Sequence, residues 1–170
     1  MAIYVWFLTL FTGLCVTDSR GNLALGATAI QSSTHNKSQT GAQNAVDGNR
    51  NSLFSLGSCS HTNADRDPWW RVDLGESYEV TRVSITNRGD SVPKRINGAQ
   101  IRIGNSLENN GNYNELAAYV ESIPAGVTKT FKFKPIKGRY VNIFIPGRNK
   151  HLTLCEGTVR EETYKIVLCS

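Results

Sequence analysis

The sequence predicts an all-β fold, a sandwich or barrel built from short strands. Apolar and polar residues alternate in several short runs, as in strands that bury one face. Gly, Pro and Asn residues interrupt these runs at short intervals, which is typical of turns between strands. No long run has the periodicity of an amphipathic helix. Together these observations indicate a β domain of the sandwich or barrel class.

The N-terminal residues, up to Thr17, form an apolar run without a charged side chain. Because the run is short for a membrane span and precedes a polar chain, residues 1–20 are predicted to be a secretory signal peptide, with the cleavage point left open. An uncleaved anchor is the alternative, since the usual basic residues are missing. Residues 21–160 then form one domain, followed by a tail or last strand over 161–170. We expect a secreted, extracellular protein that does not insert into a membrane.

The first strand is expected over residues 22–30. In the segment 69–75, Trp70, Val72 and Leu74 alternate with charged residues, so these three side chains should face the core. The other expected elements are a helical turn over 42–46 and strands over 78–86, 99–103, 127–133, 140–145, 151–155 and 163–168.

The chain is basic, with a net charge of +5 and a pI near 9.1. In its densest basic run, Lys132 and Lys134 alternate with Phe131 and Phe133, which predicts a strand with one solvated face. We therefore interpret the charge as surface polarity of a strand rather than as a nucleic-acid or heparin stripe. A secreted protein also rarely meets nucleic acid, so nucleic acid is not an expected partner.

Four cysteines are present, and Cys15 would leave with the signal peptide. The other three, Cys59, Cys155 and Cys169, predict one disulfide and one further thiol in an oxidising compartment. A bond between Cys59 and Cys155 would close a long loop and stabilise the fold by about 4–5 kcal/mol in the chain-entropy model. Cys169 would then be free or joined to another chain.

A polar loop follows the strand expected over 78–86 and contains Arg88, Asp90 and Arg95 between Gly and Pro residues. Arg side chains present parallel N–H groups that suit paired oxygens. The ligand could be a carboxylate, a phosphate or neighbouring sugar hydroxyls. For His61 alone, an ordinary surface histidine is the better interpretation.

Two other loops carry weaker signals. Residues 36–38 form an N-glycosylation sequon at Asn36. Residues 47–52 are rich in side-chain oxygens. Without further information, this composition predicts a polar turn rather than a calcium site.

Taken together and in order, His61, Arg88, Asp90 and Arg95 resemble the signature of the F-type lectin (fucolectin) family: a His, an Arg-x-Asp and a second basic residue. The resemblance extends over about 22–159. The blocks that carry it are 44–49, 57–59, 68–74, 85–90, 138–141 and 154–156.

The resemblance implies a discoidin-like jelly roll, a β-barrel or sandwich that binds terminal L-fucose on glycans through His61, Arg88 and Arg95. It also implies support of the sugar site by Asp90, Val92 and Leu56, with Phe54 or His35 nearby. Single hydrogen bonds to sugar hydroxyls contribute only about 1 kcal/mol each, so binding should depend on several sites. Relatives often form trimers, and we expect recognition of fucosylated cell surfaces in innate defence or agglutination.

The resemblance further implies one structural calcium ion. Side chains of Asp47, Ser58 and Glu156 would bind it, and the family pattern assigns carbonyl ligands to Asn44, Asn49 and Cys155. The chain departs from the family at Ser91 and Val92, where several relatives carry adjacent cysteines, and at Ser55, where relatives carry an aromatic residue. Sugar preference is therefore more open than the fold.

Three other functions are weighed against the lectin. A discoidin-like adhesion module binding protein or phospholipid would use exposed apolar residues such as Leu53, Phe54 and Leu56. Residues 88–90 spell an integrin-type tripeptide, but all three already have places in the lectin signature. An enzyme would need an activated group such as His61 beside Asp65, and no hydrolase motif accompanies it. We expect a protein without catalytic residues.

Overall fold

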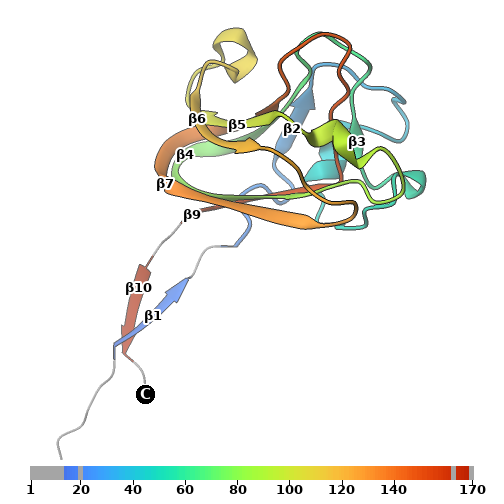
Figure 1. Ribbon diagram of the computed structural model, residues 1–170. Helices are drawn as coiled ribbons and strands as arrows, with labels where there is room; N and C mark the ends of the chain where they lie inside the picture. The colour runs from blue at the N-terminus through green and yellow to red at the C-terminus, as the bar shows by residue number, and fades with distance from the viewer. Residues whose placement is uncertain (1–13, 19–20, 162–163, 169–170) are drawn as a thin grey trace, which may run out of the picture.

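The computed structural model describes residues 14–18, 21–161 and 164–168 (Figure 1). These residues form strands and short 3-10 turns, and none of them lies in an α-helix. Among them there is accordingly no helix long and apolar enough to cross a membrane. The predicted all-β class is confirmed.

One antiparallel sheet of six strands dominates the molecule, with the order β2-β4-β7-β5-β6 and with β9 also paired to β4. Two of its strands are long, β4 (Trp69–Thr86) and β7 (Thr128–Phe144), and they pair with each other along most of their length. The shorter strands are β2 (Thr28–Gln31), β5 (Ala99–Gly104), β6 (Glu115–Val120) and β9 (Glu156–Glu161).

The sheet folds over on itself because β4 and β7 both continue through a bend. Residues 69–73 of β4 and 140–144 of β7 lie in one layer with β2, β5 and β6. In the other layer, residues 78–86 of β4 pair with 128–138 of β7 on one side, and residues 80–86 of β4 pair with β9 on the other. Register shifts in β4 between Asp73 and Tyr78 mark the bend. The result is a jelly-roll sandwich, visible in Figure 1 as a curled sheet.

Each long strand was predicted as two separate strands, because turn-forming residues interrupt the pattern in the middle of each. The chain bends there without leaving the ladder. Gly138 makes the bend in β7 feasible, since a Cβ at this position would lie 2.6 Å from the backbone nitrogen of Gly104.

The core lies between the two layers and confirms the predicted faces. Trp70, Val72 and Leu74 are 2%, 0% and 8% exposed, and burial of each side chain stabilises the fold by about 1.5–3 kcal/mol. The indole N–H of Trp70 donates to the carbonyl of Ala42 at 2.9 Å, so its one polar group is satisfied. In β7, Phe131 is buried while Lys132 is exposed, as expected for a strand with one solvated face.

The first strand begins later than predicted. Only Thr28–Gln31 form β2, and residues 23–26 form turns. The Asn22 side-chain oxygen accepts from the amides of Ala24 and Val159, so it holds a turn against β9. The helical turn expected over 42–46 is the 3-10 turn η1 (Ala42–Ala45).

A small second sheet pairs β3 (Ser60–His61) with β8 (Thr153–Leu154). The disulfide between Cys59 and Cys155 lies at the end of this ladder, one residue before β3 and one after β8. It joins cysteines 96 residues apart, and the predicted pairing is confirmed. Cys169 lies outside the described residues.

A third sheet pairs β1 (Leu14–Asp18) with β10 (Tyr164–Leu168) and extends away from the sandwich (Figure 1). β10 matches the last strand expected over 163–168. β1 lies within the predicted signal peptide, which stays a prediction.

Candidate functional site

The loops at the end of β4 and around β3 bring the three predicted sugar-binding residues together. His61 ends β3, Arg88 follows β4, and Arg95 lies in the 3-10 turn η3 (Pro93–Ile96). An Arg95 guanidinium nitrogen, Nη1, lies 2.8 Å from His61 Nε2. The Arg88 guanidinium lies 3.9 Å above the Phe54 ring, and that ring is 5.3 Å from the ring of His61.

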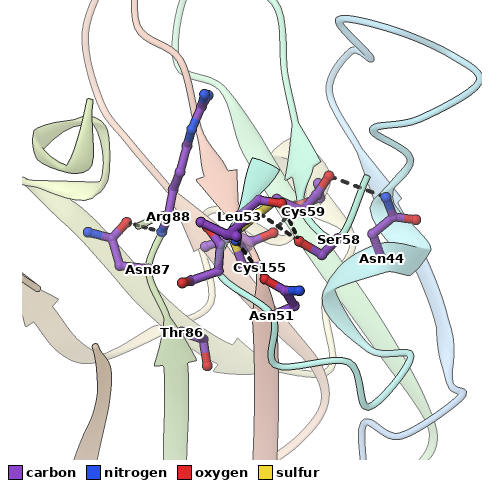
Figure 2. Close-up of a disulfide and its surroundings, with 12 residues drawn as sticks. Asn44, Asn51, Leu53, Ser58, Cys59, Thr86, Asn87, Arg88 and Cys155 are labelled. Atoms are coloured by element: carbon purple, nitrogen blue, oxygen red, sulfur yellow. Dashed lines mark hydrogen bonds between the residues drawn. A yellow bond between two sulfur atoms is a disulfide. The ribbon is translucent and has the colours of Figure 1, made fainter. Parts of the chain in front are cut away.

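A buried asparagine fixes the loop that carries both arginines. Asn87 is 2% exposed, and its side-chain amide donates to the carbonyls of Pro93 and Ile123 at 3.0 and 2.7 Å. Its oxygen accepts from the backbone amide of Arg88 at 2.9 Å, a contact visible in Figure 2. Because one side chain satisfies three backbone groups, the loop between β4 and η3 has a defined shape.

His61 is only 2% exposed and is neutral at physiological pH. Burial lowers its pKa from 6.5 to about 4, with smaller contributions from Arg95, His35 and His151, while a backbone contact with Thr62 acts in the opposite direction. Guanidinium groups only donate hydrogen bonds, so Nε2 accepts from Arg95 and the ring proton lies on Nδ1.

Arg88 is held by a carboxylate as well as by an aromatic ring. Its Nε donates to Asp90 Oδ1 at 2.6 Å, and the two side chains are 12% and 22% exposed. Asp90 Oδ2 accepts from the Ser55 amide at 3.3 Å. Although burial raises the pKa of Asp90, the contacts with Arg88 and Ser55 hold that pKa below its usual range.

Asp90, expected to support the sugar site, contacts one of its two arginines. Within the described ranges it pairs with Arg88 and has no ion pair with Arg95, whose guanidinium contacts His61 instead.

The expected apolar supports are both exposed. Val92 is 44% and Leu56 is 64% exposed. The backbone of Val92 has φ 44°, in the left-handed region that branched residues rarely adopt. This conformation places Val92 beside a depression of about 460 Å³. The depression is lined by residues of two loops: Val92, Pro93, Lys94, Arg95, Asn97, Asn149, Lys150 and His151.

His151 was not identified as a site residue from the sequence, and Phe54 was placed only near the sugar site. His151 lies 5.3 Å from the ring of His61, and His35 lies 4.9 Å from it on another loop. The predicted disulfide was the sequence signal that could have identified His151. Next to the disulfide, the chain before Cys155 runs antiparallel to the chain after Cys59, which brings His151 close to His61.

Several residues expected to bind calcium lie close to the disulfide, since Ser58 and Glu156 adjoin its cysteines and Asn44 contacts the Cys59 carbonyl. Glu156 is 1% exposed, and its Oε2 has no hydrogen-bond partner in the described part of the chain. Burial raises the pKa of Glu156 to about 7, and the negative charge of Asp47 adds to this shift. A buried carboxyl with an unused oxygen, beside a second carboxylate, is a fitting environment for a cation.

The remaining expected ligands shape the surrounding loops. The Asn44 side-chain amide donates to the carbonyls of Gln39, Gly57 and Cys59 at 2.7, 2.8 and 3.3 Å, the last of which appears in Figure 2. The Ser58 hydroxyl donates to the Leu53 carbonyl at 2.9 Å.

Asn49 closes a turn in which its amide donates to Asp47 Oδ1 at 2.8 Å. The described residues contain no group of three or more His, Cys, Asp or Glu arranged to hold a metal. A cation here would therefore take hydroxyl and carbonyl oxygens beside two carboxylates, which suits calcium better than a transition metal.

Known proteins resemble this chain over most of the described sandwich. A family model described as a NedA-like, galactose-binding domain matches residues 44–143, more than half of the chain. The fucolectin of Anguilla anguilla is 44% identical over 139 residues, which cover 79% of this chain and 87% of that protein.

Two solved structures extend the similarity to the fold. The crystal structure of an F-lectin (fucolectin) from striped bass (Morone saxatilis) serum has a TM-score of 0.80 and 48% identity, covering 92% of this chain and 51% of that one. A Streptococcus pneumoniae fucose binding module has a TM-score of 0.73 and 30% identity, covering 86% and 99% of the two chains. The chain spans 63% and 59% of the length of fucolectin-1 and fucolectin-5 of Anguilla japonica.

Proposed function

Since this chain belongs to the fucolectin, or F-type lectin, family, we propose that it is a secreted lectin that binds terminal L-fucose on glycans. The observation that carries the proposal is the convergence of His61, Arg88 and Arg95 at one end of the sandwich. The name of the Streptococcus fucose binding module points to the same sugar.

The three side chains offer the groups that a neutral sugar needs. Arg88 and Arg95 donate to hydroxyl oxygens, while the neutral His61 ring accepts from Arg95 through Nε2 and so positions that guanidinium. Val92 and Leu56 give an exposed apolar wall for the C–H face of the sugar. Asp90 and Phe54 keep the Arg88 guanidinium in place, which reduces the entropy lost on binding.

Monosaccharide binding should be weak, because each bond contributes about 1 kcal/mol, or about 1.5–3 kcal/mol with a charged donor. Useful binding to fucosylated cell surfaces then requires several sites, as in the trimer that we infer from the family. Agglutination or innate recognition of such surfaces is the corresponding role.

We also propose one structural calcium ion, held by side-chain oxygens of Asp47, Ser58 and Glu156 and by carbonyl oxygens of Asn44, Asn49 and Cys155. When bound, the calcium ion would balance the negative charge of the buried Glu156 carboxylate. The orphaned Oε2 of Glu156 supports this proposal.

The proposed activity involves no bond cleavage. With a pKa of about 4, His61 is a weak base, and Arg95 already occupies its Nε2. An adhesion module that binds protein or phospholipid is the second candidate, because Leu53, Leu56 and Val92 are 42%, 64% and 44% exposed.

A fucose competition assay with purified protein separates these functions. Binding to an immobilised fucosylated glycan should be inhibited by free L-fucose, but not by D-glucose. Arg88→Ala should weaken this binding at least tenfold, because a charged hydrogen bond contributes about 1.5–3 kcal/mol. Arg148→Ala, an exposed arginine outside the site, is the matched control. If fucose does not compete and Arg88→Ala binds normally, the lectin function is wrong.

A further inference from the structure

We propose that the depression beside the sugar site binds an anionic group, a sulfate ester or a carboxylate, carried by the same fucosylated glycan. This inference rests on the proposed function and names the class of glycan that the site prefers.

The lining of the depression is basic and contains no acidic residue. Of its eight residues, Lys94, Arg95 and Lys150 are cationic. The volume of about 460 Å³ is large enough for a substituent and part of a second sugar ring. A charged group on the ligand would thus meet only positive or neutral side chains.

The two lysines are not used inside the protein. Both Lys94 and Lys150 are exposed, and neither side chain has an ion pair or hydrogen bond within the described part of the chain. Arg95 differs, because its Nη1 is already bonded to His61. The lysines therefore remain free for a ligand.

Nearby carboxylates do not cancel this charge. Asp65 is joined to Lys150 by backbone hydrogen bonds, but its carboxylate accepts from the hydroxyls of Ser33 and Ser32. Asp90 is paired with Arg88. The hydrogen bonds of both carboxylates thus go to groups other than the two lysine ammonium groups.

The depression is continuous with the fucose site. Arg95 belongs to both, because it lines the depression and contacts His61. His151 also belongs to both, with its ring 5.3 Å from that of His61. A sugar linked to a fucose held at His61 can therefore reach Lys94 and Lys150 without leaving the surface.

The rest of the lining suits a saccharide better than a bare ion. Asn97 and Asn149 offer amide donors and acceptors for neutral hydroxyls, and Pro93 adds an apolar surface. A lysine ammonium group is a point charge on a flexible side chain, unlike the rigid guanidinium of arginine. The two lysines can therefore bind a sulfate or a carboxylate without requiring one anion geometry.

The test compares three glycans that share one fucosylated core: neutral, sulfated and sialylated. At low salt, the full chain should bind at least one acidic form about fivefold more tightly than the neutral form, because exposed ion pairs contribute about 0.2–1 kcal/mol each. The preference should shrink as ionic strength rises. Preference for only the sulfated or only the sialylated form identifies the anion.

The double substitution Lys94→Gln and Lys150→Gln should remove the preference and leave binding of the neutral glycan unchanged. Lys132→Gln with Lys134→Gln is the matched control, since these exposed lysines lie on β7 and outside the depression. Melting temperatures verify that both variants fold.

The inference is overturned if neither acidic form binds more tightly, or if the Lys94 and Lys150 variant keeps the preference. In both cases the neutral glycan still binds, so the lectin function stands. Failure of all three glycans to bind would overturn the lectin function together with this inference.

Discussion

The two polar regions that flank the Cys59–Cys155 bridge are opposite in charge. On one side, Arg88 and Arg95 surround a neutral histidine beside an open depression. On the other side, the buried Glu156 lies close to Asp47 and leaves an oxygen without a partner. The first region has spare donors for a ligand, and the second has spare acceptors for a cation.

One covalent link thus joins the loops of two proposed sites whose environments differ. His61 follows Cys59 by two residues and Glu156 is adjacent to Cys155. The ligand site must stay open to solvent, whereas the acidic site is stable only when its charge is balanced. Three experiments distinguish what the two regions share from what belongs to each.

The largest effect is expected from removing the bridge that both regions share. The double substitution Cys59→Ala and Cys155→Ala should lower the free energy of unfolding by about 4–5 kcal/mol, because the unfolded chain regains the freedom of a long loop. Denaturant unfolding measures the loss. Both fucose binding and the response to calcium should weaken together. If one survives intact, the regions are not coupled through the bridge.

A smaller effect should be confined to the cationic region. Because burial lowers the pKa of His61 from 6.5 to about 4, the folded state binds fewer protons than the unfolded state between these values. The stability that neutral His61 contributes is therefore complete above pH 6.5 and is lost as the pH falls through 4. The His61 contribution of about 3 kcal/mol should disappear between pH 7 and pH 4, while the raised pKa of Glu156 acts with the opposite sign over this range.

Thermal or denaturant unfolding over this pH range measures that loss. The profile of His61→Gln should lack the His61 loss between pH 6.5 and pH 4, because the side chain no longer titrates, so the difference between the two profiles isolates it. His35→Gln should keep most of the slope, since His35 is exposed and contributes less to the His61 shift than burial does. An equal slope in the His61 variant would contradict the assignment.

The smallest effect belongs to the acidic region and depends on calcium concentration. At a free calcium concentration one hundred times the dissociation constant, binding should stabilise the fold by about 2.7 kcal/mol. Asp47→Ala should lower the melting temperature in calcium and remove the difference between calcium and chelator. Asp67→Ala, outside this region, should keep that difference. A normal calcium response in Asp47→Ala would contradict the proposed calcium site.

The alternation of residues made much of the fold predictable, and the places where it failed have physical causes. Trp70, Val72 and Leu74 were assigned correctly because a strand with one buried face has a strict period of two. β9 was not predicted, because it buries Glu156 and Glu161 at 1% and 6% exposure and so lacks the apolar signature of a core strand. Its burial depends on β4, which local sequence does not reveal.

Only those residues of the candidate site that belong to the family signature could be predicted from the sequence. His61, Arg88 and Arg95 came from their order along the chain, and the structure places them together. His151 belongs to no local motif, because a disulfide between distant residues brings it beside His61. The open Lys94 and Lys150 surface likewise depends on how two loops meet.

The unbroken course of β4 has a mechanical consequence for the proposed lectin, which would hold cells by their glycans. The strand runs from Trp69 to Thr86, two residues before Arg88, and it pairs along its length with β2, β7 and β9. Antiparallel hydrogen bonds lie across the strand axis, so under tension along the strand many of them would bear the load together instead of opening one after another. The loop that carries Arg88 is thus attached to a strand suited to resist a pull on a bound glycan.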